Sequence, residues 1–213
     1  MSDSAAAVRD RVVGAPGAMI VIISGPSGVG KDTIIRTLRK RHPDPSRHFV
    51  VTYKTRSPRP GEIQGVDYQF VSIDDFLRLL VEGELLEASE VHGHWSGTPR
   101  DQVAGALVAG RDAILKIDVQ GADKIKAHVP DALRIFVAPP SAEARRRRLA
   151  RRATETAEEQ AQRNRDAERE MEYMDEYDYV VVNETGRVEE TAQEIDEIIR
   201  REHAAHPDRC IGV

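Results

Sequence analysis

The sequence has little cysteine and no long apolar run, and each shortage excludes a class of protein. Its 213 residues include a single cysteine, Cys210, which excludes an internal disulfide framework and a cysteine-cluster metal site. The longest clean apolar run near the N-terminus covers residues 18–23. That run is too short to span a membrane and lacks the layout of a signal peptide. We therefore expect a cytoplasmic protein that does not bind membranes.

An excess of positive charge is missing as well. The chain has 31 Lys and Arg against 36 Asp and Glu, giving a net charge of −5. Proteins that coat nucleic acid are normally basic, so we expect no nucleic-acid partner. Apolar residues make up 40% and charged residues 31% of the chain, as in ordinary soluble globular proteins. The length is sufficient for one domain with a buried core.

Apolar segments alternate with helical patterns from residue 18 onward. We expect strands at 19–24, 49–52, 68–72, 85–91, 94–98, 113–118, 133–138 and 179–182. Helices are expected at 31–41, 73–83, 100–109, 121–128, from 141, from 156 to about 174, and at 188–201. Ser72, Ser141 and Thr156 are the expected helix caps. This alternation predicts an α/β fold with a parallel sheet covered on both faces.

Two segments interrupt the alternation. Residues 1–17 show no sustained period and end in Gly-Ala-Pro-Gly, so we expect a mobile tail. Residues 53–67 are rich in proline, glycine and charge and are predicted to form a loop. This loop opens a polar insert, 53–100, that has the character of a second lobe.

A glycine-rich segment follows the first predicted strand. Residues 24–33 read Ser-Gly-Pro-Ser-Gly-Val-Gly-Lys-Asp-Thr and lead into a predicted helix. Glycines let backbone amides curl around phosphate oxygens, and the lysine supplies a positive charge. The alternative is a glycine-rich turn without a ligand. We expect this loop to bind the phosphates of ATP through Gly25, Ser27, Gly28, Val29, Gly30, Lys31, Asp32 and Thr33.

One position of this loop departs from the usual pattern. A Ser or Thr normally follows the lysine and its hydroxyl contacts Mg²⁺. Here Asp32 occupies that position and Thr33 comes one residue later. A carboxylate is also a hard oxygen ligand, so Asp32 could bind Mg²⁺ directly or through water, although it adds negative charge beside the phosphates.

Two further groups could handle a phosphorylated substrate. Arg56 and Arg59 flank Ser57-Pro58, and two guanidinium groups at this spacing could converge on one phosphate, with the Tyr68 hydroxyl as an added donor. A solvated basic loop is the alternative. Asp118 ends a predicted central strand, where it could hold Mg²⁺ or organise the acceptor. Asp118 could equally cap the following helix.

Four segments together resemble the guanylate kinase family. They are GPSGVGK at 25–31, TRSPRPGEIQGVDYQF at 55–70, LLEASEVHG at 85–93 and IDVQGA at 117–122. The resemblance covers nearly all of residues 18–200. It implies a P-loop NTPase core within 18–205, with an inserted mixed β/α monophosphate-binding lobe at 50–100 and a helical lid at 141–170. Residues 1–17 and 206–213 would then be tails.

The resemblance also implies an activity. It predicts Mg²⁺-dependent transfer of the γ-phosphoryl group of ATP to GMP, and also to dGMP, which gives ADP and GDP. The protein would act on these small molecules as a monomer or homodimer.

Residue roles carry over from the family by position. Arg56, Arg59 and Tyr68 would bind the acceptor phosphate and Glu87 would read guanine. The set of expected GMP-binding residues also includes Thr52, Ser96, Thr98 and Asp118, and the expected metal ligands are Asp32, Thr33 and Asp118. The expected catalytic residues are Lys31, Arg56 and three lid arginines, Arg148, Arg152 and Arg163. Arg145, Arg146, Arg147 and Arg151 are expected on solvated helix faces.

Three further positions differ from the family pattern. Lys116 replaces an acid two residues before Asp118, Ser96 replaces a phosphate-binding tyrosine, and Tyr53-Lys54 interrupts a run of small hydroxyl residues. Lys116 shares a strand face with Asp118 and could pair with it or with a substrate phosphate. These changes leave two alternatives open: a kinase for another nucleotide or a phosphorylated sugar, and a non-catalytic module that holds a phosphopeptide.

Overall fold

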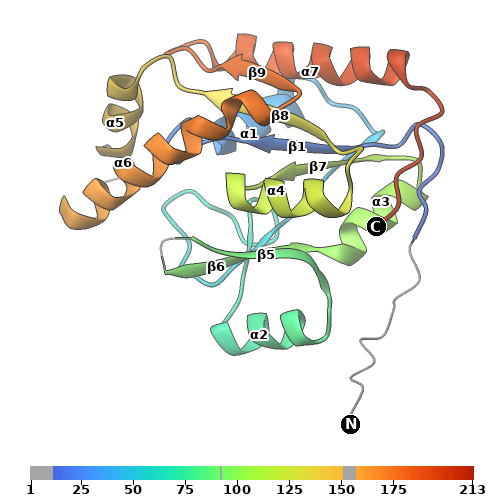
Figure 1. Cartoon of the computed structure of the whole chain (residues 1–213), viewed down its shortest axis with the longest axis horizontal. Coiled ribbons are helices and arrows are strands. Elements are labelled where there is room, and N and C mark those ends of the chain that lie inside the picture. The colour runs from blue at the N-terminus through green and yellow to red at the C-terminus, as the bar shows by residue number, and fades with distance from the viewer. Residues whose placement is uncertain (1–11, 92, 151–156) are drawn as a thin grey trace.

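The fold is a three-layer α/β/α domain with a smaller β-rich lobe beside it (Figure 1). The computed structural model describes residues 12–91, 93–150 and 157–213. The expectations for residues 1–11, for Arg151 and Arg152, and for Thr156 as a helix cap lie outside this range. No helix in the described ranges has both the length and the apolar character needed to cross a membrane.

The main sheet has five parallel strands in the order β2-β7-β1-β8-β9. Their bounds are Arg47–Phe49 for β2, Asp112–Lys116 for β7, Ile20–Ser24 for β1, Leu133–Ala138 for β8 and Tyr179–Val182 for β9. Every residue of β1 and β8 is buried, because helices cover both faces of the sheet. The predicted parallel sheet is therefore confirmed.

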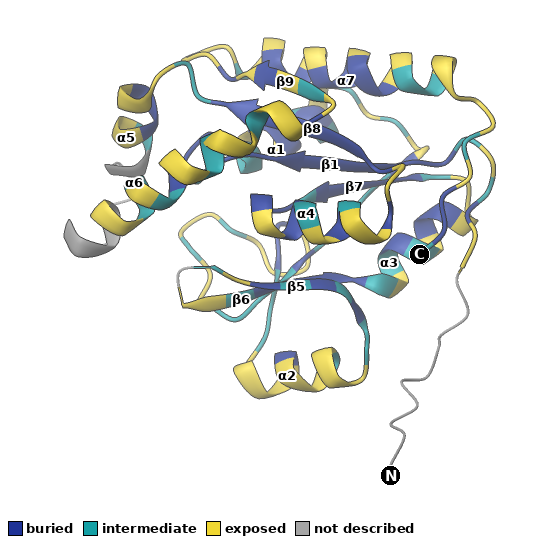
Figure 2. Ribbon diagram, viewed as in Figure 1, coloured by how far each residue is buried: buried dark blue, intermediate teal, exposed yellow. Residues whose placement is uncertain are grey.

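Two pairs of helices cover the two faces of the sheet. On one face lie α1 (Lys31–Arg41) and α7 (Val188–Ala205), whose buried residues include Ile34 and Ile195. On the other face lie α3 (Arg100–Val108) and α4 (Val119–His128), which contribute Leu107 and Ile125. Figure 2 shows the buried sides of these helices turned toward the sheet. Successive strand residues supply alternate faces, so Val21 packs with α1 and Ile22 with α4.

The smaller lobe is a four-stranded sheet in the order β4-β3-β6-β5. Its strands are Tyr53–Lys54 (β3), Gln69–Phe70 (β4), Leu85–Val91 (β5) and His94–Pro99 (β6), and α2 (Ile73–Val81) packs on it through Phe76. The Ser72 hydroxyl accepts a hydrogen bond from the Asp75 amide at 3.1 Å, which is the predicted cap. The remaining helices are α5 (Ala142–Ala150), α6 (Ala157–Glu172) and the short 3₁₀ helix η1 (Tyr173–Glu176).

Several segments differ from the sequence prediction. The strand expected at 49–52 lies earlier, at Arg47–Phe49, and the strand expected at 68–72 shortens to Gln69–Phe70. Within the segment predicted as loop, Tyr53–Lys54 forms β3 because it pairs with both β4 and β6. These short strands depend on partners distant in sequence, which local patterns do not reveal.

The segments expected as separate tails meet each other. The amide of Gly14 donates to the Ile211 carbonyl at 2.8 Å, and the amide of Val12 donates to the Val213 carbonyl at 2.8 Å. Ile211 is buried and packs in the same cluster as Leu107 of α3. Residues 12–14 and 211–213 are thus held as a backbone ladder against the core, which differs from the expectation for these residues.

The turn after β1 brings two backbones into close contact at Gly25. Gly25 has a φ of +133°, and a Cβ atom there would lie 2.3 Å from the Val137 carbonyl oxygen of β8. A side chain at this position would therefore require both a strained backbone and displacement of β8.

We expect Gly25→Ala to lower the free energy of unfolding by at least about 2 kcal/mol. Gly186→Ala is the matched control, because Gly186 also has a positive φ, +84°, but nothing lies within 4 Å of a Cβ there. Urea unfolding of both variants measures the difference. Equal losses in the two variants would contradict the close approach at Gly25.

Candidate active site

An open cleft lies between the core and the smaller lobe. Its walls bring together residues that are far apart in the sequence, from the loop after β1 to the lid helix α6. Among them are the expected site residues Gly25, Ser27, Gly28, Val29, Gly30, Lys31, Asp32, Arg56, Arg59, Tyr68, Asp118 and Arg163. A concave, polar site of this kind is suited to a small phosphorylated ligand.

The glycine-rich loop forms the core side of the cleft. The helix α1 begins at Lys31, directly after Gly30 in the left-handed conformation with a φ of +99°. Nζ of Lys31 donates to the carbonyl oxygens of Gly25 and, at 3.2 Å, Pro26. The amide of Ser27 donates to a carboxylate oxygen of Glu170 in α6 at 3.2 Å. The Glu170 carboxylate therefore lies at an amide of the loop that leads into the N-terminus of α1, and helix N-termini favour anions.

Sequence reasoning missed Glu170. Burial raises the pKa of its carboxyl group despite the nearby charge of Lys31. Its position on α6 gives no signal, because acidic residues are common on exposed helix faces and the contact to Ser27 joins residues 143 positions apart.

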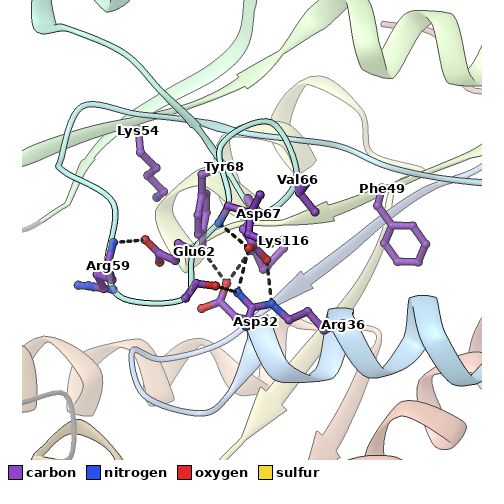
Figure 3. A network of polar contacts seen from close by, with 12 residues as sticks. Asp32, Arg36, Phe49, Lys54, Arg59, Glu62, Val66, Asp67, Tyr68 and Lys116 are labelled. Atoms are coloured by element: carbon purple, nitrogen blue, oxygen red, sulfur yellow. Dashed lines mark hydrogen bonds and ion pairs between the residues drawn. The ribbon is translucent and has the colours of Figure 1, made fainter.

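Asp32 and Lys116 form an ion pair on the floor of the cleft. Nζ of Lys116 lies 2.5 Å from Oδ1 of Asp32, and the Tyr68 hydroxyl donates to the same oxygen at 2.8 Å (Figure 3). Burial alone would raise the pKa of Asp32, but Lys116 and the two hydrogen bonds hold that pKa well below its usual value. The two departures from the family pattern on the core side therefore neutralise each other.

The loop between β3 and β4 is tied to α1. Arg36 binds Asp67 through two hydrogen bonds of 2.9 Å, and it also donates to the Gly61 carbonyl at 2.9 Å. In the same loop, Arg56 forms a two-fold hydrogen-bonded pair with Glu62, with both distances 2.7 Å. The loop that carries the expected acceptor-phosphate residues is therefore fixed in place before any ligand arrives.

Glu87 lies behind the cleft and is buried. Its side-chain oxygens accept hydrogen bonds from the hydroxyls of Thr98, at 2.8 Å, and Ser89, at 3.1 Å. Burial, with the neighbouring charge of Asp118, raises the pKa of Glu87 to about 7. Glu87 does not line the cleft, but a carboxylate in its charged form is suited to accept hydrogen bonds from a base edge.

Three of the other expected acceptor residues are buried beside Glu87 and do not line the cleft. Thr52, Ser96 and Thr98 are each at most 2% exposed. The Thr52 hydroxyl has no hydrogen-bond partner within the described part of the chain. Such a buried and unsatisfied hydroxyl is uncommon in folded proteins and is consistent with a ligand partner.

The lid arginines differ from one another in position. Arg163 lines the cleft, whereas Arg148 donates to the carbonyl oxygens of Val29, at 3.0 Å, and Asn183, at 2.9 Å. In this conformation Arg148 holds α5 against the outer side of the glycine-rich loop. Arg145 is 1% exposed, so the expectation of a solvated position was wrong: its side chain packs between α5 and α6, near the Asn164 carbonyl.

The expected metal ligands are only partly brought together. Asp32 and Asp118 line the cleft, but Thr33 is exposed and does not. Oδ1 of Asp118 accepts the Gly121 amide at 2.9 Å, which makes Asp118 a helix cap as well. In the described ranges no cluster of three or more His, Cys, Asp or Glu could hold a metal. The remaining carboxylate oxygens suit a Mg²⁺ ion that is bound mainly by nucleotide phosphates and water.

We expect Asp32→Ala and Lys116→Met each to destabilise the protein, because each leaves a buried charge without its partner. In a double-mutant cycle the coupling energy should be about 1–3 kcal/mol. Urea unfolding of the two single variants and the double variant measures it. A coupling energy within error of zero would show that the two side chains do not form this pair in solution.

Comparisons with known proteins agree with this geometry. A family model described as guanylate kinase matches residues 18–202. The guanylate kinase of Mycobacterium sp. (strain MCS) is 47% identical over 166 residues, which cover 77% of this chain and 83% of that protein. The guanylate kinase of Synechococcus sp. (strain JA-3-3Ab) is 41% identical over 180 residues, which cover 84% of this chain and 81% of that protein.

A solved structure shows the same architecture. The crystal structure of guanylate kinase from Anaplasma phagocytophilum superposes with a TM-score of 0.73 at 34% identity, covering 90% of this chain and 88% of that one. The family model matches from the start of the core through the smaller lobe and into α7. The chain therefore belongs to the guanylate kinase family.

Proposed function

We propose that this protein, in the cytoplasm, transfers the γ-phosphoryl group of ATP to GMP, giving ADP and GDP, and also to dGMP, giving ADP and dGDP. The observation that carries the proposal is that two groups of residues expected to bind phosphate line one cleft. The glycine-rich loop with Lys31 forms one side, and the loop with Arg56, Arg59 and Tyr68 forms the other. Two anionic substrates would therefore meet with their phosphates facing each other.

The donor nucleotide would be held by the core. Loop amides and Lys31 would bind the β- and γ-phosphates. The hydrogen bond from the Ser27 amide to Glu170 would then have to break. Asp118 and Asp32 would hold Mg²⁺, which when bound neutralises charge on the phosphates.

The acceptor nucleotide would be held by the smaller lobe. Its phosphate would be bound by Arg56, Arg59 and Tyr68. The Arg56 guanidinium group would then give up its hydrogen bonds to Glu62 and donate to the phosphate oxygens instead. Glu87 would accept the N1–H and N2–H₂ donors of guanine, with Thr98 fixing the carboxylate. Adenine does not present that pair of donors, so the arrangement would select guanine.

The transfer itself would require little covalent chemistry from the protein. An oxygen of the GMP phosphate attacks the γ-phosphorus, and the bond to the β-phosphate oxygen of ATP breaks. That acceptor oxygen is already anionic at neutral pH, so no general base is required. Arg163, with Arg148 and Arg152 after closure of the lid, would stabilise the charge that spreads over the transferred group. Closure would also exclude water and prevent ATP hydrolysis.

An acceptor screen tests the proposal. With ATP as donor, GMP and dGMP should be turned over, whereas AMP, UMP and sugar phosphates should not. Glu87→Gln should lower kcat/KM for GMP by about 100-fold or more and change the KM for ATP little, since the donor site is separate. Glu90→Gln, an exposed position on the same strand, is the control. Turnover of another acceptor with GMP inert would contradict the substrate assignment, and a lack of Mg²⁺-dependent ATP binding would point to a non-catalytic module.

The pH dependence of GMP binding provides a second test. Because burial raises the pKa of Glu87 to about 7, this carboxyl group is protonated in the free protein at lower pH and cannot accept from N1–H. GMP affinity should therefore fall as pH decreases below about 7, by up to about tenfold per unit.

The phosphate of GMP also titrates near this range, so the comparison is between the wild type and Glu87→Gln by calorimetry from pH 5.5 to 8. In Glu87→Gln, the change of GMP affinity with pH should be only the change that titration of the GMP phosphate causes. Identical slopes in both proteins would show that Glu87 does not contact the base.

A further inference from the structure

Lys54 places a further cation at the acceptor side of the cleft. It lies in β3, directly opposite Ser96 of β6, and its side chain lines the cleft together with Arg56, Arg59 and Tyr68. Figure 3 shows Lys54 extending toward the side on which Arg59 and Tyr68 lie. The pairing of β3 with β6, which local sequence patterns do not reveal, fixes this position.

Two of the cations near Lys54 have anionic partners. Arg56 is paired with Glu62, and Lys116 with Asp32. Nζ of Lys54 instead donates to the neutral Ser96 hydroxyl at 2.7 Å and lies 5.5 Å from the centre of the Tyr68 ring. Within the described ranges its ammonium group contacts no carboxylate at ion-pair distance.

This environment is costly for a positive charge. Burial lowers the pKa of Lys54 to about 8, even though Asp118 and Glu87 lie close enough to favour its charged form. Lys54 is half-buried, and an ammonium group that is partly removed from water without an ion-paired carboxylate destabilises the protein unless an anion arrives. Groups of this kind are concentrated at ligand sites.

We propose that Lys54 binds the phosphate of the acceptor nucleotide, as a cation that supplements Arg56, Arg59 and Tyr68. The small Ser96 side chain leaves room for the lysine, and its hydroxyl orients the ammonium group. The phosphate would supply an anionic partner in direct contact with the ammonium group. This inference rests on the proposed function, since it assumes an acceptor that carries a phosphate.

A purely structural role would be different. If Lys54 served only to join β3 to β6 through Ser96, a neutral side chain that still donates a hydrogen bond would replace it. The effect on a ligand would then not depend on whether that ligand has a phosphate group.

The test variant is Lys54→Gln, which removes the charge and retains a donor for Ser96. Lys40→Gln, at an exposed position on α1, is the matched control for loss of one positive charge. Calorimetry compares GMP with guanosine, and steady-state kinetics give KM for GMP and for ATP. We expect Lys54→Gln to weaken GMP binding and raise the KM for GMP by about 10- to 100-fold. Guanosine affinity and the KM for ATP should stay within about twofold.

Two results would overturn the proposal. One is GMP affinity within about twofold of the wild type in Lys54→Gln. The other is an equal loss of GMP and guanosine affinity, which a structural role predicts. If Lys54→Gln does not fold, as judged by thermal unfolding, Lys54→Met is measured in the same way and judged by the same two results. Failure of the wild type to phosphorylate GMP would instead refute the proposed function, so the two failures are distinguishable.

Discussion

The cleft is organised by the need to balance its positive charges with acceptors inside the protein. Lys31 donates to loop carbonyls, Arg56 is paired with Glu62, and Lys116 is paired with Asp32. The Glu170 carboxylate accepts a hydrogen bond from the Ser27 amide of the glycine-rich loop. Each of these contacts gives a partner to a polar or charged group whose burial without a partner would cost much free energy. Substrate binding in this account is an exchange, in which phosphate oxygens replace internal acceptors.

The same requirement explains why two unusual residues occur together. Without a partner, the Asp32 carboxylate, which directly follows the P-loop lysine, would repel phosphates. Without a partner, the Lys116 ammonium group would be a largely buried cation. Paired at 2.5 Å, Asp32 and Lys116 form a neutral unit, and the Tyr68 hydroxyl joins it to the smaller lobe. Arg36 and Asp67 make a second link between α1 and that lobe. The two halves of the cleft are therefore connected through polar contacts before closure.

Local sequence patterns predicted the elements whose signals are local. The strands Leu85–Val91, Leu133–Ala138 and Tyr179–Val182 have the predicted bounds, because continuous or alternating apolar residues identify buried strands. The strand at Tyr53–Lys54 was missed because only its pairing with β4 and β6 makes it a strand. For the site, motif spacing predicted the glycine-rich loop, Arg56 and Arg59, which line one cleft, and the family resemblance predicted Glu87. It could not find Glu170, because the contact with Ser27 depends on tertiary packing.

The central claim is that two nucleotides bind with their phosphates facing each other across this cleft. A crystal structure of the protein with GMP and a non-hydrolysable ATP analogue tests it most directly. The account predicts the GMP phosphate among Lys54, Arg56, Arg59 and Tyr68, guanine against Glu87, and the triphosphate in the glycine-rich loop. GMP bound on any other surface, or bound with its phosphate turned away from that loop, would contradict it.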